Sequence, residues 1–143
     1  LKPMFPLADI PVIQLSLDYT KTPQQHFEFA KELAALRDRG VLVMGSGNIV
    51  HNLGRIDWQH PNSGYDWAIE FNDQVKKTIL DRNFAQLSNY KSLSKSAELA
   101  VPSTEHYLPL LYATALATEK DQLEFFNDDP QMGSLTMTSL KIS

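Results

Sequence analysis

Apolar runs and amphipathic stretches alternate along the first third of the chain. Residues 11–17 and 41–44 are apolar and contain β-branched side chains, which indicates two buried strands. Between them, Thr22 and Gln25 have the spacing of a capping box at a helix start, and Gly40 can end that helix in the left-handed conformation. Strand, helix and strand in this order predict a βαβ unit with parallel strands and a right-handed crossover. The pattern therefore predicts an α/β fold.

Two further helices and a terminal pair of strands are expected downstream. Apolar residues spaced three to four apart indicate a helix over residues 65–82. A third helix is expected near Thr104, and it should start late or bend because Pro109 removes a backbone donor. The remaining segments are predicted as a short helix with a loop (83–100) and as two strands that could pair (122–126 and 135–142).

Composition restricts the class of protein. The chain has 143 residues, the length of one ordinary domain, and its 43% hydrophobic and 21% charged content is typical of a soluble globular protein. Thirteen Lys and Arg against seventeen Asp and Glu give a net charge of -4, which argues against a nucleic-acid binder. We find no apolar run near the ~20 residues that cross a bilayer, so we expect no membrane association.

Cysteine is absent, and this narrows the possible chemistry. The chain has no disulfide, no thiolate nucleophile and no cysteine-based metal site. We expect a cytoplasmic location, with which the lack of disulfides is compatible. Any metal held by this chain must therefore be bound by its four histidines and its carboxylates.

A glycine-rich segment with a histidine, residues 45–53, follows the second predicted strand. Ligands bind at the carboxyl ends of parallel strands in open α/β sheets, and glycines allow a close backbone approach. A dinucleotide fingerprint would need glycine where Val50 stands, and no lysine follows to make a phosphate-binding loop. The alternative is a plain connection in which His51 only bonds the backbone.

A second polar cluster places Glu105, His106 and Tyr107 at the start of the third predicted helix. Glu105 would be stabilised there by the helix dipole whether or not it takes part in chemistry. Two histidines and a carboxylate are the donor set of non-haem Fe(II) sites, although such residues also occur together by chance. We expect His26 to be a partly exposed helix residue and His60 to be a loop residue that could line a pocket.

At these residues the sequence resembles the C-terminal part of the class III extradiol ring-cleavage dioxygenases, of the 4,5-DOPA extradiol dioxygenase type. The matching stretches lie in the family's order along nearly the whole chain, whereas residues 83–101 match nothing in the family pattern and are a candidate for shaping substrate choice. The stretches are DIPVIQLS (9–16), HFE to LAALRD (26–38), GSGNIVHNL (45–53), EHYLPLLY (105–112) and MGSL (132–135).

The resemblance implies a three-layer α/β sandwich around a mixed, partly parallel sheet, with residues 1–143 forming the C-terminal part of one domain. The start at Leu1, without an initiator methionine, agrees with an expected N-terminal half that carries the remaining metal histidines. This half would be the chain's partner. The 143 residues alone are therefore not expected to turn over.

The activity implied by the resemblance is the opening of a catechol-type, DOPA-like ring with O2 at a non-haem Fe(II) or Zn2+ site. His51 would be the acid–base group, and His51, His106 and Glu105 are the candidate metal ligands. The expected substrate contacts are Ser46, Gly47, Asn48 and Tyr107. The alternatives are a zinc-dependent hydrolase and a non-catalytic remnant on the same fold.

Overall fold

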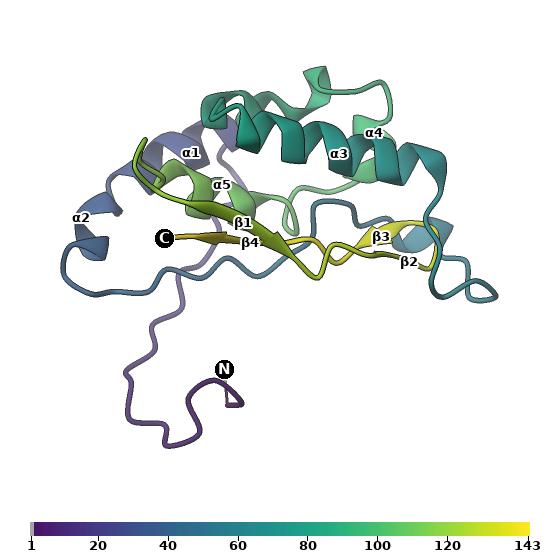
Figure 1. Ribbon diagram of the computed structural model, residues 1–143. Helices are drawn as coiled ribbons and strands as arrows, with labels where there is room; N and C mark the ends of the chain where they lie inside the picture. The colour runs from purple at the N-terminus through teal and green to yellow at the C-terminus, as the bar shows by residue number, and fades with distance from the viewer. Residues whose placement is uncertain (1) are drawn as a thin grey trace.

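A computed structural model describes residues 2–143 as a group of helices with two small antiparallel sheets (Figure 1). The helices are α1 (Pro23–Lys31), α2 (Ala34–Arg37), η1 (Leu53–Arg55), α3 (Asp66–Leu80), η2 (Phe84–Ser92), α4 (Ala97–Ala100) and α5 (Leu108–Ala115). The strands are β1 (Leu123–Phe126), β2 (Pro130–Gln131), β3 (Leu135–Thr136) and β4 (Ser139–Ile142). Among the helices so described, none is both long enough and apolar enough to cross a membrane.

The predicted parallel pairing of residues 11–17 with residues 41–44 is wrong for this structure. Both segments are extended, but within residues 2–143 neither joins a ladder, and the chain before α1 runs away from the helices (Figure 1). Most of their apolar side chains are exposed, up to 92% for Ile13, whereas Leu17 and Val43 are half-buried. A strand needs a neighbour for its backbone hydrogen bonds. In the described part of the chain, parallel pairing is limited to one bridge between Gly64 and Gly133.

The predicted helix start at Thr22 is confirmed. The Gln25 N–H donates to the Thr22 hydroxyl at 3.2 Å, and the Thr22 N–H donates to the Gln25 side chain at 2.9 Å. The predicted single helix is divided into α1 and α2, and Gly40 follows with φ of +76°, the left-handed conformation expected for it.

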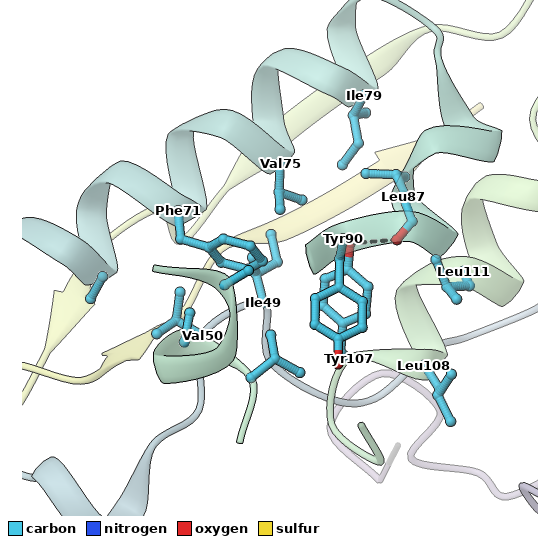
Figure 2. Packing of buried hydrophobic residues seen from close by; sticks show 14 of the residues in the cluster. Ile49, Val50, Phe71, Val75, Ile79, Leu87, Tyr90, Tyr107, Leu108 and Leu111 are labelled. Atoms are coloured by element: carbon cyan, nitrogen blue, oxygen red, sulfur yellow. Dashed lines mark hydrogen bonds between the residues drawn. The ribbon is translucent and has the colours of Figure 1, made fainter. Parts of the chain in front are cut away.

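A core between α3, η2 and α5 supports the start of α5 (Figure 2). Phe71, Val75 and Ile79 lie on one face of α3, as their spacing predicts, and all three are fully buried. Leu87 and Tyr90 enter the core from η2, and the residues Tyr107, Leu108 and Leu111 enter it from the α5 region. α5 begins at Leu108 with Pro109 in its first turn, which confirms the late start.

The terminal strands pair antiparallel, as predicted, but over a shorter length. Leu123 lies opposite Ile142 and Phe126 opposite Ser139. The first part of the predicted second strand forms β3, which pairs with β2 instead. The β3 backbone also bonds to the glycine-rich segment, since the Thr136 N–H donates to the Val50 carbonyl at 3.2 Å. This short strand therefore connects the sheet region to the His51 loop.

We expect the loss of the ion pair between Arg37 and Asp121 to remove a pH-dependent part of the stability. The guanidinium donates to both Asp121 carboxylate oxygens at 2.8 Å and holds the pKa of Asp121 well below its ordinary value. A lowered pKa stabilises the fold above the ordinary pKa of an aspartate, and the contribution disappears as the pH falls through the lowered value.

Asp121→Asn should therefore lower the free energy of unfolding at pH 7 by about 1–3 kcal/mol. The free energy of unfolding should also decrease less in the variant than in the wild type as the pH is lowered. Urea unfolding of the complete protein between pH 7 and 2 measures both effects. Asp81→Asn, which removes a solvent-exposed pair with Lys77, is the control and should change little. Equal unfolding curves for the two variants would contradict the prediction.

Candidate active site

His51 is held in place by its own backbone. Its N–H donates to the Ala100 carbonyl at the end of α4 at 3.0 Å, and the residue forms a bridge with Leu135 in β3. The next residue, Asn52, donates its N–H to the Ser134 carbonyl and its side-chain amide to the Leu99 carbonyl, at 3.1 and 2.8 Å. Main-chain bonds on both sides therefore fix the loop without using the imidazole.

His106 is fixed by the residue that follows it. Tyr107 is 1% exposed, and its hydroxyl donates to the Leu87 carbonyl at 3.1 Å (Figure 2). Its ring packs on Tyr90, with 4.9 Å between the ring centroids. The turn that carries His106 is thereby tied to the core, and its imidazole remains half-buried at the surface.

The two glycines of the GSG motif bring the two histidine segments together. A Cβ on Gly47 would lie 2.1 Å from the His106 carbonyl oxygen, and a Cβ on Gly45 would lie 2.5 Å from the Pro109 carbonyl oxygen. Neither glycine has a positive φ, so their role is the absence of a side chain. In this close approach the Asn48 N–H donates to the His106 carbonyl at 2.9 Å.

As a result, the imidazoles of His51 and His106, 55 positions apart in the chain, lie against each other. Their ring centroids are 3.7 Å apart and their planes differ by 13°. Burial and the neighbouring His106 lower the pKa of His51, while Glu105 acts in the opposite direction. His51 is therefore neutral at pH 7 and able to accept a proton.

Glu105 lies beside this pair as a carboxylate. The Ser103 hydroxyl donates to Glu105 Oε1 at 2.7 Å, and this bond lowers the pKa of Glu105. His106 and His51 act on the Glu105 carboxyl in the same direction, which places its charge near both rings. The three candidate ligands predicted from the sequence therefore lie in one region.

The donor types agree with a metal, but the described residues do not complete a site. Imidazole nitrogen and carboxylate oxygen are suitable donors for both Fe(II) and Zn2+. Within residues 2–143, no three histidine and acidic side chains converge closely enough to hold an ion. The nearly parallel rings of His51 and His106 also direct their in-plane lone pairs side by side instead of toward one point. This chain can supply only part of a coordination sphere.

The four expected substrate contacts differ in how far they are exposed to solvent. Ser46 and Gly47 are exposed on the loop. Asn48 is half-buried, and its side-chain amide donates to the Thr136 carbonyl at 2.8 Å. Tyr107 points into the core, where burial raises its pKa and its hydroxyl has a protein partner. Asn48 and Tyr107 thus position the histidines through the backbone.

Comparisons with known proteins relate this arrangement to a family. Residues 1–136 match the family described as the catalytic LigB subunit of aromatic ring-opening dioxygenase. The chain belongs to this family.

Several curated LigB-family relatives are named 4,5-DOPA dioxygenase extradiol. The protein from Escherichia coli (strain K12) is 40% identical over 142 residues, covering 97% of this chain and 52% of the relative. The protein from Portulaca grandiflora is 34% identical, with 98% and 52% covered. A crystal structure of an uncharacterized protein from Escherichia coli K12 superposes with a TM-score of 0.91 at 39% identity, covering 99% of this chain and 59% of that one.

This LigB-family chain therefore spans about half the length of the curated relatives that it matches. The part of those relatives that lies outside the match has no counterpart in the 143 residues.

The two other histidines of this LigB-family chain lie away from the pair. The expectation that His26 is partly exposed is wrong, because its side chain is 1% exposed and bonds the Tyr112 hydroxyl at 2.8 Å and the Asp18 carbonyl at 3.1 Å. It lies on the face of α1 that packs against α5, and this contact buries it. His60 is exposed and pairs with Asp57 at 2.8 Å, and it lines neither of the two pockets beside α1 and α5.

Two polar residues that frame the His51 loop were not identified from the sequence. The Ser134 hydroxyl donates to the Asn52 carbonyl at 2.7 Å, and the Thr136 hydroxyl accepts from the Val50 N–H at 3.3 Å. Both side chains are buried. The sequence signal for them is the alternation of Ser134 and Thr136 around the apolar Leu135, which in an extended segment places both side chains on one face.

We expect Gly47→Val to abolish most activity of the complete protein while helix content stays constant. The new Cβ would overlap the His106 carbonyl, so the loop must move away and the two histidines must separate. Steady-state turnover and far-UV circular dichroism measure the two effects. Gly54→Val is the control, because a Cβ there meets only the Asn52 side chain, at 3.3 Å. Full activity of Gly47→Val would show that the close approach is dispensable.

Proposed function

We propose that the complete protein is a metal-dependent extradiol dioxygenase that opens catechol-type rings with O2, and that its substrate is DOPA-like. The observation that carries this proposal is the contact between the His51 and His106 imidazoles, built by main-chain bonds from two distant segments. Membership of the LigB family and the names of the relatives agree with it.

We infer that the complete domain is a three-layer α/β sandwich around a mixed sheet, with strands contributed by an N-terminal half of the same protein. Residues 11–17 and 41–44 are extended and apolar, but most of their side chains are exposed here. Such segments are stable when neighbouring strands pair with them and helices cover them. The relatives have about as many further residues as this chain contains, enough for those neighbours.

In this proposal, His106 is the chain's nitrogen donor to non-haem Fe(II) or Zn2+, and Glu105 is the competing carboxylate. His51 would reach the metal only where no catechol lies between them. We favour His106 because Glu105 is hydrogen-bonded by Ser103. The remaining donors would come from the N-terminal half. A metal bound there would supply chelation sites for the two catechol oxygens and electron density for O2.

His51 would act as the acid–base group of the reaction. Its lowered pKa keeps a ring nitrogen unprotonated, so it can take the proton that a catechol hydroxyl must lose on binding. The same nitrogen can return a proton to oxygen later in the turnover. Ser46 and Gly47 are exposed on the same loop and would contact the substrate, while Asn48 and Tyr107 hold the loop and the turn of His106 in place.

The test is anaerobic loading of the complete protein with Fe(II), followed by L-DOPA and then oxygen. A yellow ring-opened product with one O2 consumed per ring supports the proposal. Hydrolysis of ester or amide substrates by the zinc-loaded protein without oxygen uptake would support a zinc hydrolase instead. A full-length protein that retains no stoichiometric iron or zinc would be a non-catalytic remnant.

A further inference from the structure

A cleft opens next to the histidine pair and has no part in the chemistry described so far. It has a volume of about 680 Å3 and lies between the segment before α1, the end of η2 and the turn that precedes α5. This volume lies within the range of cavities that bind small molecules. Glu105 lines the cleft, and because both His106 and His51 lower the pKa of its carboxyl, this wall of the cleft lies near the histidine pair, although neither imidazole lines it.

Two walls of this cleft carry opposite charges. Lys91, from η2, lines one wall, and Glu105, from the turn before α5, lines another. The Ser103 hydroxyl, itself a lining residue, holds the Glu105 carboxylate in place at 2.7 Å. The lining also includes Tyr90 and Pro102, which offer apolar surface. A ligand with one cationic and one anionic group would meet a partner for each charge.

Lys91 is available for such a ligand. Its ammonium pairs with Glu98 at 3.0 Å, but both side chains are largely exposed to solvent, at 62% and 76%. Exposed ion pairs of this kind are weak and exchange readily. A ligand carboxylate in the cleft can therefore replace Glu98 as the partner of Lys91.

We propose that this cleft binds the zwitterionic amino-acid tail of the catechol substrate, with Lys91 on the tail carboxylate and Glu105 facing the tail ammonium. This inference rests on the proposed function, since the catechol ring itself would lie at His51 and His106. It assigns a substrate-selecting role to part of residues 83–101, the segment that lies outside the motifs of the resemblance.

The sharpest test compares L-DOPA with dopamine, which has the same ring and ammonium but no carboxylate. In the complete protein, Lys91→Met should lower the ratio of kcat/KM for L-DOPA over dopamine on the order of tenfold, mainly through KM. Glu98→Gln should raise that ratio, because it removes the competing carboxylate. Lys95→Met is the matched control, a neighbouring lysine that does not line the cleft, and it should leave the ratio unchanged.

An unchanged ratio in Lys91→Met, or an equal fall in Lys95→Met, would overturn the assignment while ring opening itself continued. Calorimetric titration of L-DOPA and dopamine without oxygen separates this result from a failure of the proposed function. A preference for L-DOPA that depends on Lys91 supports the cleft even if no ring is opened. Equal binding of both compounds by the wild type overturns the assignment whatever the activity.

Discussion

Replacing His51 with phenylalanine in the complete protein is expected to lower ring-opening turnover about 10²- to 10⁴-fold, while the metal and the catechol stay bound. The range is the usual contribution of one positioned proton-transfer group and equals about 3–5 kcal/mol of activation barrier. A large structural effect is not expected, because the loop is fixed by backbone N–H groups that donate to the Ala100 and Ser134 carbonyls and do not involve the imidazole.

Three measurements decide the role of His51: turnover, metal content after dialysis, and catechol affinity without oxygen. Residual activity that rises at alkaline pH would agree with hydroxide from solvent replacing the lost base. His60→Phe is the matched control, since His60 is exposed and paired with Asp57. Wild-type turnover in His51→Phe would refute the acid–base role, and complete loss of metal would make His51 an essential ligand.

Replacing His106 with alanine is expected to remove the metal from the complete protein. In the proposed function, His106 is the metal ligand that this chain supplies, and its loss from a set of three or four donors leaves too few to hold Fe(II) against dilution. We expect metal affinity to fall by more than about 100-fold, measured as metal content after dialysis and by competition with a chelator.

Glu105→Gln serves as the comparison for His106→Ala. It keeps the size of the side chain and a group that can bond Ser103, but removes the charge. Metal retained in Glu105→Gln and lost in His106→Ala assigns the ligand to His106. The reverse result would transfer the role to the carboxylate. Circular dichroism must show the same helix content in both variants, as expected for residues that lie before the first turn of α5.

Local features of the fold could be predicted from the sequence because their causes lie within a few residues. The capping box at Thr22, the left-handed Gly40 and the buried stripe of α3 each depend on near neighbours. The pairing of residues 11–17 with 41–44 could not, because an apolar pattern shows that a segment needs covering but not which segment covers it.

For the histidine pair, too, the local features could be predicted from the sequence and the long-range contact could not. The residue types and the glycines marked both segments, but their separation by 55 positions gave no reason for contact. The contact depends on a long-range fit, in which side-chain-free positions 45 and 47 let one backbone reach the carbonyls of His106 and Pro109. The burial of His26 was missed for the same reason, since its partner Tyr112 lies 86 positions away.

The exposed apolar segments have a practical consequence for producing this chain. Ile13 and Leu42 lie on extended stretches that, within the described residues, have no strand beside them, and extended chains with free backbone donors and acceptors pair with one another between molecules. Material made from residues 1–143 alone should therefore self-associate, increasingly so at high concentration and on warming. If the proposed N-terminal half pairs with these segments, its joint expression should keep the material soluble, as size-exclusion chromatography would measure.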